Sequence, residues 1–149
     1  MERKIISIPP NYFYLTIVFI VICRFLFPSY KFIQAPYNYL GFIIIFLGCL
    51  TEIWAWLLFK KYKTPEDFSE SVKLVTEGIF KITRNPMYLG MLLMTIGLSF
   101  VLNNYVSFIG SVFLFLIVHF MFIPFEEEKN YKTFGQQYLD YKSKVRKWL

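Results

Sequence analysis

Charged residues, histidine and cysteine are all scarce in this chain. Only 17% of its 149 residues are charged, against about 25% in an average soluble domain. There is one histidine, and the two cysteines, Cys23 and Cys49, both lie in apolar runs. This composition excludes a disulfide framework and offers no spacing typical of a metal site, so we expect the cysteines to be small apolar fillers. No internal repeat or low-complexity linker is present, and a single domain, residues 1–149, is expected.

Apolar residues take the place of the missing charge. Hydrophobic residues make up 56% of the chain, including 18 Phe, and the mean hydropathy is +0.47. A soluble domain of this size could not bury so much apolar surface. The composition therefore predicts an all-α integral membrane protein.

Four apolar segments are long enough to be considered as membrane-spanning helices, at about residues 12–27, 38–59, 87–102 and 106–125. The third is short for a perpendicular span of ~20 residues, so it either tilts little or forms one arm of a hairpin that does not fully cross. Only three residues separate it from the fourth, which predicts a tight antiparallel hairpin. The alternative for the first segment is a cleaved signal peptide, but no small-residue cleavage site follows it.

The cations define an expected orientation. Of the 16 lysines and arginines, 14 precede the first span, lie between the second and third, or follow the fourth. The positive-inside rule then places both termini and the segments 60–86 and 126–149 in the cytoplasm. Topology and anionic lipid account for the net charge of +6 without a nucleic-acid partner.

The second cytoplasmic segment begins with three consecutive carboxylates, Glu126-Glu127-Glu128, which is unusual for an anchor because cations anchor better in an anionic leaflet. Beyond them, apolar residues recur every three or four positions and predict one amphipathic helix, with Tyr131, Phe134, Tyr138, Tyr141 and Val145 on its apolar face. Such a helix can simply rest on lipid. We favour the alternative that the two cytoplasmic segments fold together over the end of the bundle.

The first cytoplasmic segment is rich in turn signals. Thr64-Pro65-Glu66-Asp67 predicts the start of a short helix, and Gly78 permits a backbone close to a ligand. Arg84 offers a planar fork suited to a carboxylate or phosphate, although a positive-inside anchor explains it equally well. Pro86 is expected in the first turn of the third helix, whose N-terminal amides favour an anion.

Two ionisable residues stand out inside the spans. Glu52 is the only carboxylate in a span and is a functional candidate for that reason. Its depth differs from that of Arg24 by roughly 15 Å, too far for an ion pair between straight helices. Glu52 is therefore protonated, paired elsewhere or, as we favour, facing a polar cavity near the cytoplasmic side. His119, in the fourth span, is more typical of a hydrogen-bonded packing residue than of a proton carrier.

A set of short motifs occurs in a specific order and covers roughly two-thirds of the chain, from about Leu47 onward. The motifs are Trp54-Ala55, Leu74-Val75-Thr76-x-Gly78, Arg84-Asn85-Pro86-x-Tyr88-x-Gly90, Glu126-Glu127, and Phe134-Gly135-x-x-Tyr138-x-x-Tyr141 with Val145-Arg146. Together they resemble the isoprenylcysteine carboxyl methyltransferase and phospholipid methyltransferase superfamily of integral membrane enzymes.

The resemblance implies transfer of a methyl group from S-adenosylmethionine to a lipophilic acceptor at the cytoplasmic face. The implied cofactor-binding residues are Gly78, Ile79, Phe80, Arg84, Asn85, Tyr88, Gly90, Glu126 and Glu127. Arg84 and Glu127 are the predicted catalytic residues, and Glu52 and Trp54 the predicted acceptor contacts. The chemistry suits these types, because the cofactor's carboxylate needs a cation and its ammonium an acid, while its adenine favours an aromatic wall such as Phe80 or Tyr88.

Three departures from the family pattern are visible. Asn85 replaces the usual histidine, so this position can hydrogen-bond but cannot carry a proton. The family's glutamate pair is either Glu126-Glu127, which we prefer, or Glu127-Glu128 with a one-residue deletion before Phe134. The chain also has fewer expected spans than the larger carboxyl methyltransferases.

Two other functions fit parts of the pattern. Membrane sterol reductases, which use NADPH, share an Arg-His-x-x-Tyr-x-Gly-like segment, but here the methyltransferase proline is kept and no cation cluster for a 2′-phosphate is evident. A small membrane scaffold needs neither the paired glutamates nor the basic glycine-containing segment. The acceptor is left open between a prenylated cysteine carboxylate, a phospholipid amine and a small hydrophobic thiol or amine, and so is the oligomeric state. The short loops predict the plasma (inner) membrane of a prokaryote.

Overall fold

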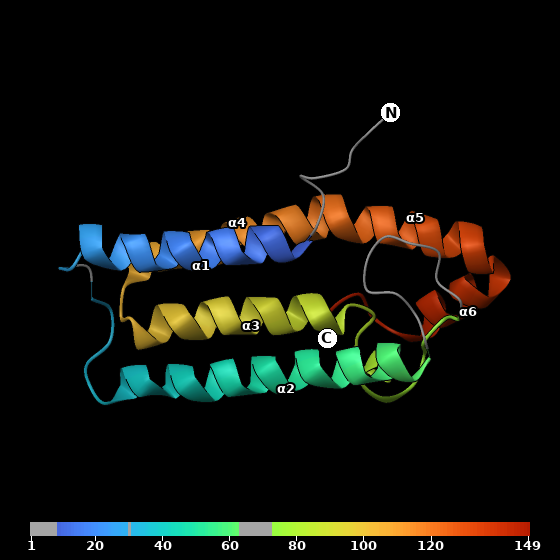
Figure 1. Cartoon of the computed structure of the whole chain (residues 1–149), viewed down its shortest axis with the longest axis horizontal. Coiled ribbons are helices and arrows are strands. Elements are labelled where there is room, and N and C mark those ends of the chain that lie inside the picture. The colour runs from blue at the N-terminus through green and yellow to red at the C-terminus, as the bar shows by residue number, and fades with distance from the viewer. Residues whose placement is uncertain (1–8, 30, 63–72) are drawn as a thin grey trace.

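The computed structural model describes residues 9–29, 31–62 and 73–149, and these form a bundle of helices with no strand among them (Figure 1). The helices are α1 (Pro9–Leu26), α2 (Leu40–Lys61), α3 (Pro86–Val101), α4 (Phe108–Ile117), α5 (Ile123–Phe134) and α6 (Gln136–Lys144). A π-helical turn, η4 (Val118–Phe122), joins α4 to α5, so that the three form one continuous helix. The helix predicted to start at Thr64 lies outside the described residues.

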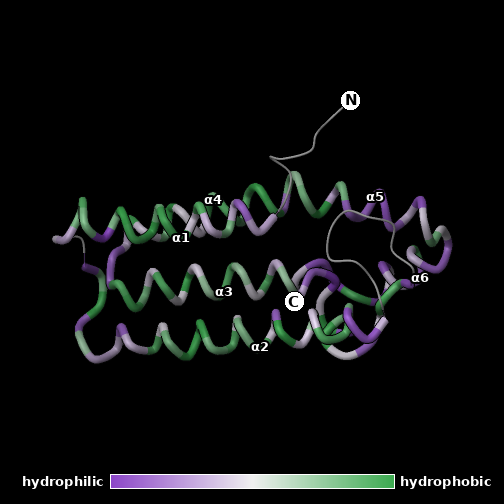
Figure 2. The backbone as a smooth tube through the Cα atoms, viewed as in Figure 1, coloured by the Kyte–Doolittle hydropathy of each residue, from purple (hydrophilic) through white to green (hydrophobic). Residues whose placement is uncertain are grey.

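Three helical stretches are long and apolar enough to cross a membrane, namely Pro9–Leu26, Tyr37–Lys61 and Tyr105–Phe134. A further apolar helix, α3, has only 16 residues, and it corresponds to the short third segment expected from the sequence. Many large apolar side chains are exposed on the outside of the bundle. Hydrophilic residues gather at the end that carries α6 (Figure 2). The all-α membrane architecture is thus confirmed, whereas the count of four full spans and their orientation stay predictions.

Paired glycines hold α2 and α3 together. A Cβ added to Gly41 would lie 2.4 Å from the carbonyl oxygen of Gly97, and one added to Gly48 would lie 2.8 Å from that of Gly90. Only glycine permits this approach, and close backbone packing is the main source of helix association in lipid. The two pairs lie seven residues apart on each helix, and they place α3 antiparallel to α2 along its length (Figure 1).

A short turn connects α3 to α4, as the sequence predicts. The Asn104 side chain accepts a hydrogen bond from the Ser107 N–H (3.2 Å) and donates to the Phe27 carbonyl at the end of α1 (2.7 Å). The Ser107 hydroxyl donates to the carbonyl of Ile20, also in α1 (3.1 Å). This turn therefore fixes the antiparallel pair α3–α4 and ties α1 alongside α4.

The C-terminal segment differs from the single amphipathic helix predicted. Helix α5 ends at Phe134, and the chain turns at Gly135 (φ 52°, ψ −124°) into α6, which runs back toward the bundle. Glycine is the one residue that adopts this backbone conformation without steric cost. The prediction of one continuous helix is therefore wrong, and Tyr131 is exposed. The other four residues of the predicted apolar face do pack in one cluster: Phe134, Tyr138, Tyr141 and Val145.

The two segments expected in the cytoplasm do pack together where the structure describes them. They share one apolar cluster, made of Ala55, Leu74, Val75, Ile79, Phe80, Tyr138 and Tyr141. The Tyr141 hydroxyl also donates to the Phe80 carbonyl (2.7 Å). The prediction that these segments fold over one end of the bundle is confirmed, and this cap places the polar residues described next.

Candidate active site

An ion pair between Arg84 and Glu127 lies at the centre of the polar end of the molecule. Arg84 lies two residues before the start of α3, Glu127 lies on α5, and the distance from Arg84 Nη2 to Glu127 Oε1 is 2.9 Å. Lys142 of α6 contacts the other carboxylate oxygen, Oε2, at 2.7 Å. The Arg84 and Glu127 side chains are only 8% and 16% exposed, so the pair is largely buried. Lys142, which is more exposed, contacts it from the solvent side.

The guanidinium of Arg84 retains hydrogen-bonding capacity. Its Nε and Nη1 atoms are buried and have no hydrogen-bond partner among the described residues, and Glu127 Oε1 accepts no hydrogen bond of good geometry. A buried donor left unpaired costs about 1–3 kcal/mol, so an arrangement of this kind is typical of a place where another molecule supplies the partner. The free donors fit a carboxylate, and the glutamate oxygen fits an ammonium.

A second carboxylate, Glu126, lies beside this pair and is bound by Tyr88. The Tyr88 hydroxyl donates to Glu126 Oε1 at 2.6 Å, and Tyr88, in the first turn of α3, is buried. The helix from Tyr105 to Phe134 has 30 residues, about 45 Å at 1.5 Å per residue, so its acidic end extends beyond a hydrocarbon core of ~30 Å.

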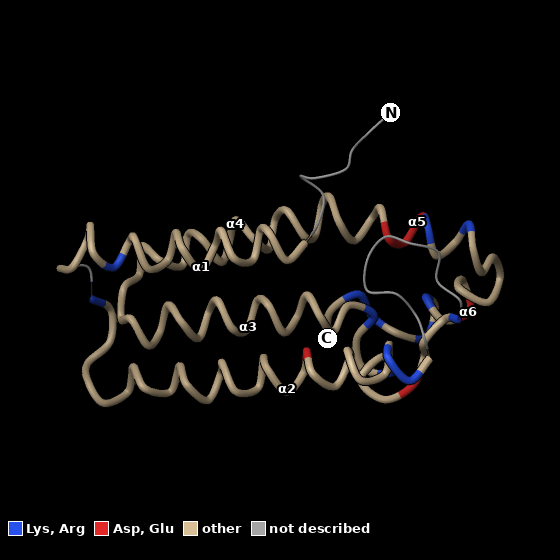
Figure 3. The backbone as a smooth tube through the Cα atoms, in the orientation of Figure 1, with Lys and Arg blue, Asp and Glu red and all other residues tan. Residues whose placement is uncertain are grey.

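Glu126 lies in the first turn of α5, just beyond the predicted span 106–125. Charged residues gather at the end of the molecule that carries α5 and α6 (Figure 3). Burial raises the pKa of Glu126 to about 7, and the hydrogen bond from Tyr88 opposes that rise. A carboxyl group with this pKa can exchange a proton near neutral pH.

The third glutamate of the run is directed elsewhere. Glu128 is exposed and forms an ion pair with Lys132, one turn further along α5. Successive residues on a helix are 100° apart, so three consecutive side chains cannot all face one neighbour. Glu126 and Glu127 are the two that contact residues at the start of α3.

The chain just before α3 is held by hydrogen bonds on both sides of Arg84. Thr83 is fully buried, and its hydroxyl accepts from the Asn85 N–H (3.2 Å) and donates to the Lys147 carbonyl (3.1 Å). The Asn85 side-chain amide donates to the same carbonyl (2.8 Å). Pro86 occupies the first turn of α3, as predicted. The structure thus uses the Asn85 amide within the protein, and its contact with a cofactor stays a prediction.

The glycine turn expected near the cofactor packs against α2. Gly78 has a φ of 58° and begins a short 3-10 turn, η2 (Gly78–Lys81). A Cβ at Gly78 would lie 2.9 Å from Leu58 Cδ1 and 3.1 Å from the indole nitrogen of Trp54. Ile79 and Phe80, which follow, are buried. The turn therefore needs glycine for its backbone and for its close approach to α2.

Two further predicted site residues, Glu52 and Gly90, meet at the α2–α3 contact. A Cβ added to Gly90 would lie 3.0 Å from the Cβ of Glu52, so Glu52 faces α3 at Gly90, two residues along the chain from Tyr88. Trp54 is about half exposed beside Gly78. Arg24 donates to the Pro28 carbonyl at the opposite end of the molecule. Contact of Glu52 and Trp54 with an acceptor stays a prediction.

Three residues of this region are not predicted from the sequence, because they belong to none of its recognisable motifs: Thr83, Lys142 and Trp148. The sequence alone predicts that Lys142 faces solvent. In the structure it contacts Glu127, because α6 folds back toward the bundle. Trp148 does have one signal, because an aromatic residue directly after Arg146 and Lys147 is out of place in a solvated segment. Its position is shown by the hydrogen bond between the Trp148 indole N–H and His119 Nδ1 (3.0 Å). His119 is thus a hydrogen-bonded packing residue, as predicted.

Comparison with known proteins agrees with the resemblance to membrane methyltransferases. The model of the phospholipid methyltransferase family matches residues 37–137. The chain is 39% identical over 80 residues to protein-S-isoprenylcysteine O-methyltransferase B of Arabidopsis thaliana, covering 51% of this chain and 39% of that protein. It is 29% identical over 136 residues to the Saccharomyces cerevisiae protein-S-isoprenylcysteine O-methyltransferase, covering 81% of this chain and 54% of that protein.

These alignments are partial on the relatives' side. The chain spans 39% and 40% of the lengths of the two Arabidopsis thaliana isoprenylcysteine O-methyltransferases, B and A. The family match nevertheless includes Arg84, Tyr88, Glu126 and Glu127. The region of similarity and the buried charged site therefore coincide.

Proposed function

Because the chain belongs to the phospholipid methyltransferase family, we propose that it transfers a methyl group from S-adenosylmethionine to a lipophilic acceptor at the cytoplasmic face of a membrane. The observation that carries this proposal is the buried Arg84–Glu127 pair, in which two nitrogen atoms of the guanidinium have no partner among the residues that the structure describes. A protein that needed only structural support from this pair would satisfy those donors.

The residues present fit the amino acid end of the cofactor. Within the described chain, Arg84 has free donors on two different edges of its guanidinium, Nε and Nη1, and either can donate to the cofactor's carboxylate, while the Glu127 oxygen that accepts no hydrogen bond receives its ammonium. Glu126, kept in place by Tyr88, adds a second carboxylate on the same side. Lys142 holds Glu127 from the solvent side, so that the carboxylate keeps its position while Arg84 engages the cofactor.

The chemical step is a displacement at the methyl carbon. When bound, the cofactor supplies an electrophilic methyl group on a sulfonium, and the acceptor's lone pair forms the new bond as the carbon–sulfur bond breaks. The protein's contribution is to hold the acceptor in line and to exclude water. Glu52 and Trp54, on α2 near the start of α3, are the residues proposed to contact the acceptor as it enters from the bilayer.

The acceptor class determines whether a proton must move. A carboxylate acceptor, as the names of the relatives indicate for those proteins, carries no proton to remove. An amine acceptor loses one proton during the transfer. Glu126, with a pKa of about 7, is the group in the described site that can accept it.

The test uses the protein in lipid nanodiscs and S-adenosylmethionine with a labelled methyl group. A prenylated cysteine and an aminophospholipid are supplied in parallel, and label in the lipid fraction is measured for the wild type, Arg84→Met and Glu128→Gln. We expect labelling of one acceptor by the wild type and by Glu128→Gln, and none by Arg84→Met. Equilibrium binding of S-adenosylmethionine and of NADPH is measured in parallel. Binding of NADPH alone would overturn the proposal in favour of a reductase, and binding of neither by folded protein would favour a scaffold.

A further inference from the structure

The chain returns from α6 to the bundle through residues 145–148, here called the return segment. Val145 is extended (φ −120°, ψ 133°), and the two following carbonyl groups accept hydrogen bonds from the chain around Arg84. The Arg146 carbonyl accepts from the Arg84 N–H at 3.0 Å. The Lys147 carbonyl accepts from Thr83 (3.1 Å) and from Asn85 (2.8 Å). Three consecutive residues, 83–85, are thus bound by two consecutive carbonyls.

The return segment is fastened at Trp148. Its indole N–H donates to His119 Nδ1 at 3.0 Å. Its ring lies nearly parallel to the His119 ring (interplanar angle 14°) and packs against Phe115, with ring centroids 5.5 Å apart. We call this contact between Trp148 and His119 the latch. His119 lies in the π-helical turn η4, which changes the direction of side chains relative to a regular α-helix and is frequent at functional sites.

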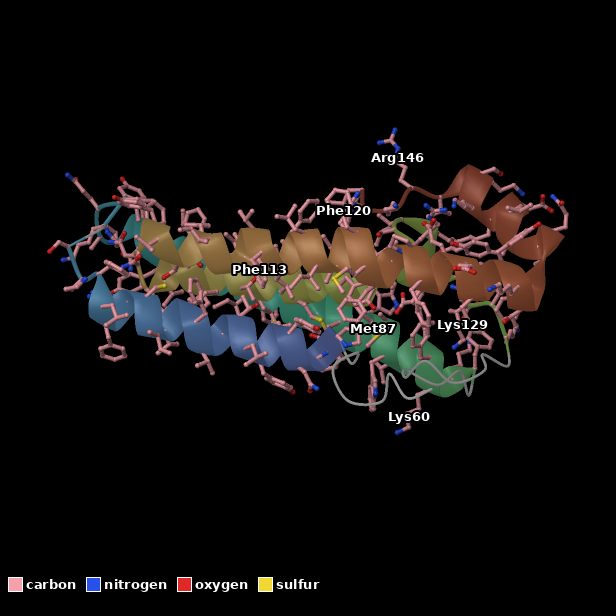
Figure 4. The ribbon with its side chains drawn as sticks, turned by 90° about the horizontal axis from the view of Figure 1, so that it is seen from above. Lys60, Met87, Phe113, Phe120, Lys129 and Arg146 are labelled. Atoms are coloured by element: carbon pink, nitrogen blue, oxygen red, sulfur yellow. The ribbon has the colours of Figure 1, made fainter. Side chains whose placement is uncertain are left out.

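The return segment acts through its backbone and Trp148. The Arg146 side chain is exposed and extends away from the molecule (Figure 4). Thr83 and Asn85 are buried, so their donors would lose their acceptors if the segment moved away. Loss of a buried hydrogen bond to an unpaired state costs about 1–3 kcal/mol. The position of the backbone at Arg84 is therefore coupled to the position of the return segment.

We propose that His119 and Trp148 are positioning residues for the cofactor site: the latch holds the return segment, whose carbonyl groups fix the backbone of Arg84 so that its guanidinium stays against Glu127. The inference rests on the proposed function for its ligand, S-adenosylmethionine. A simpler role for Trp148 would be as an aromatic anchor at the membrane surface. In that role the indole N–H would face lipid headgroups, but here it is bound to His119.

The chain allows a matched pair of variants. His119→Asn keeps an acceptor, because Oδ1 is attached to Cγ in the same way as Nδ1, whereas His119→Leu removes it. Trp148→Phe keeps an aromatic ring and removes the donor. Three quantities are measured for each purified variant: the Kd for S-adenosylmethionine, the melting temperature, and the hydrogen exchange of the peptide that contains Arg84 without cofactor.

We expect His119→Leu and Trp148→Phe to raise the Kd by about three- to tenfold, as the loss of one net hydrogen bond predicts, and to speed exchange at the Arg84 amide. His119→Asn should restore both values to near wild type. Equal losses in His119→Asn and His119→Leu, or melting temperatures that fall while Kd and exchange stay unchanged, would overturn the positioning role.

The two proposals fail in different ways. If the wild type binds S-adenosylmethionine and Arg84→Met does not, but the latch variants behave as wild type, the positioning role is wrong and the proposed function stands. If the wild type does not bind the cofactor, the proposed function fails, and the exchange of the Arg84 amide in His119→Leu and His119→Asn still decides whether the latch fixes this backbone.

Discussion

Two buried polar clusters lie at opposite ends of α3, and they are built differently. At the α3–α4 turn, Asn104 and Ser107 are neutral, and they bond to carbonyl groups of α1 and to each other. At the start of α3, Arg84 and Glu127 are charged, and two buried nitrogen atoms of Arg84 have no partner in the described part of the chain. The first cluster is complete within the protein. The second becomes complete only with a further molecule, which is why we place function there.

The largest effect on stability is expected from Glu127→Met. This change leaves the Arg84 guanidinium buried without its counter-ion, and breaking a buried ion pair in this way costs about 3–5 kcal/mol. The matched control is Glu128→Gln, which affects only an exposed pair with Lys132 and should cost less than about 1 kcal/mol. Thermal unfolding in detergent compares the two. Similar melting temperatures for both variants would contradict the burial of the Arg84–Glu127 pair.

A smaller loss is expected at the complete cluster. Asn104→Leu removes the hydrogen bonds from the side chain to Phe27 and from Ser107, and an interhelical hydrogen bond in a membrane protein contributes about 0.6–2 kcal/mol. The melting temperature should fall, but the Kd for S-adenosylmethionine should stay within about twofold of wild type. A large rise in Kd with an unchanged melting temperature would show that the two ends are not separate in function.

The smallest effect concerns pH. The pKa of Glu126 rises from its ordinary 4.5 to about 7 on folding, so between these values the folded protein holds a proton that the unfolded chain has lost. Stability therefore falls as the pH rises from about 4.5 to 7 and levels off above. Glu126→Gln should flatten this dependence. Tyr88→Phe removes the hydrogen bond that opposes the shift and should extend the fall to higher pH.

Much of the fold follows from hydropathy alone. The expected spans at 12–27, 38–59 and 87–102 agree within three residues with α1, α2 and α3. The fourth differs, because the helix continues from the apolar residues through the glutamates to Phe134. A helix that extends into water keeps its backbone hydrogen bonds while its hydropathy changes, so hydropathy shows where a span ends and not where the helix ends.

The site was only partly predictable. Arg84, Tyr88, Glu126 and Glu127 are recognisable from motifs, but which glutamate meets Arg84 depends on the phase of α5, which the order of residues does not reveal. The contact between His119 and Trp148 depends on the reversal of the chain at Gly135 and on the π-helical turn. Both are tertiary features that override the simple period of an amphipathic helix.

The most direct measurement is the equilibrium binding of S-adenosylmethionine to the wild type, Arg84→Met and Asn104→Leu, with melting temperatures measured in parallel. The loss of a hydrogen bond between two charged groups predicts a loss of affinity of about ten- to hundredfold in Arg84→Met. Its melting temperature should fall less than that of Glu127→Met, because Glu127 keeps Lys142. Asn104→Leu should lower the melting temperature and leave the affinity near that of the wild type. Affinity within about threefold of wild type in Arg84→Met would contradict the assignment of the cofactor site to Arg84 and Glu127.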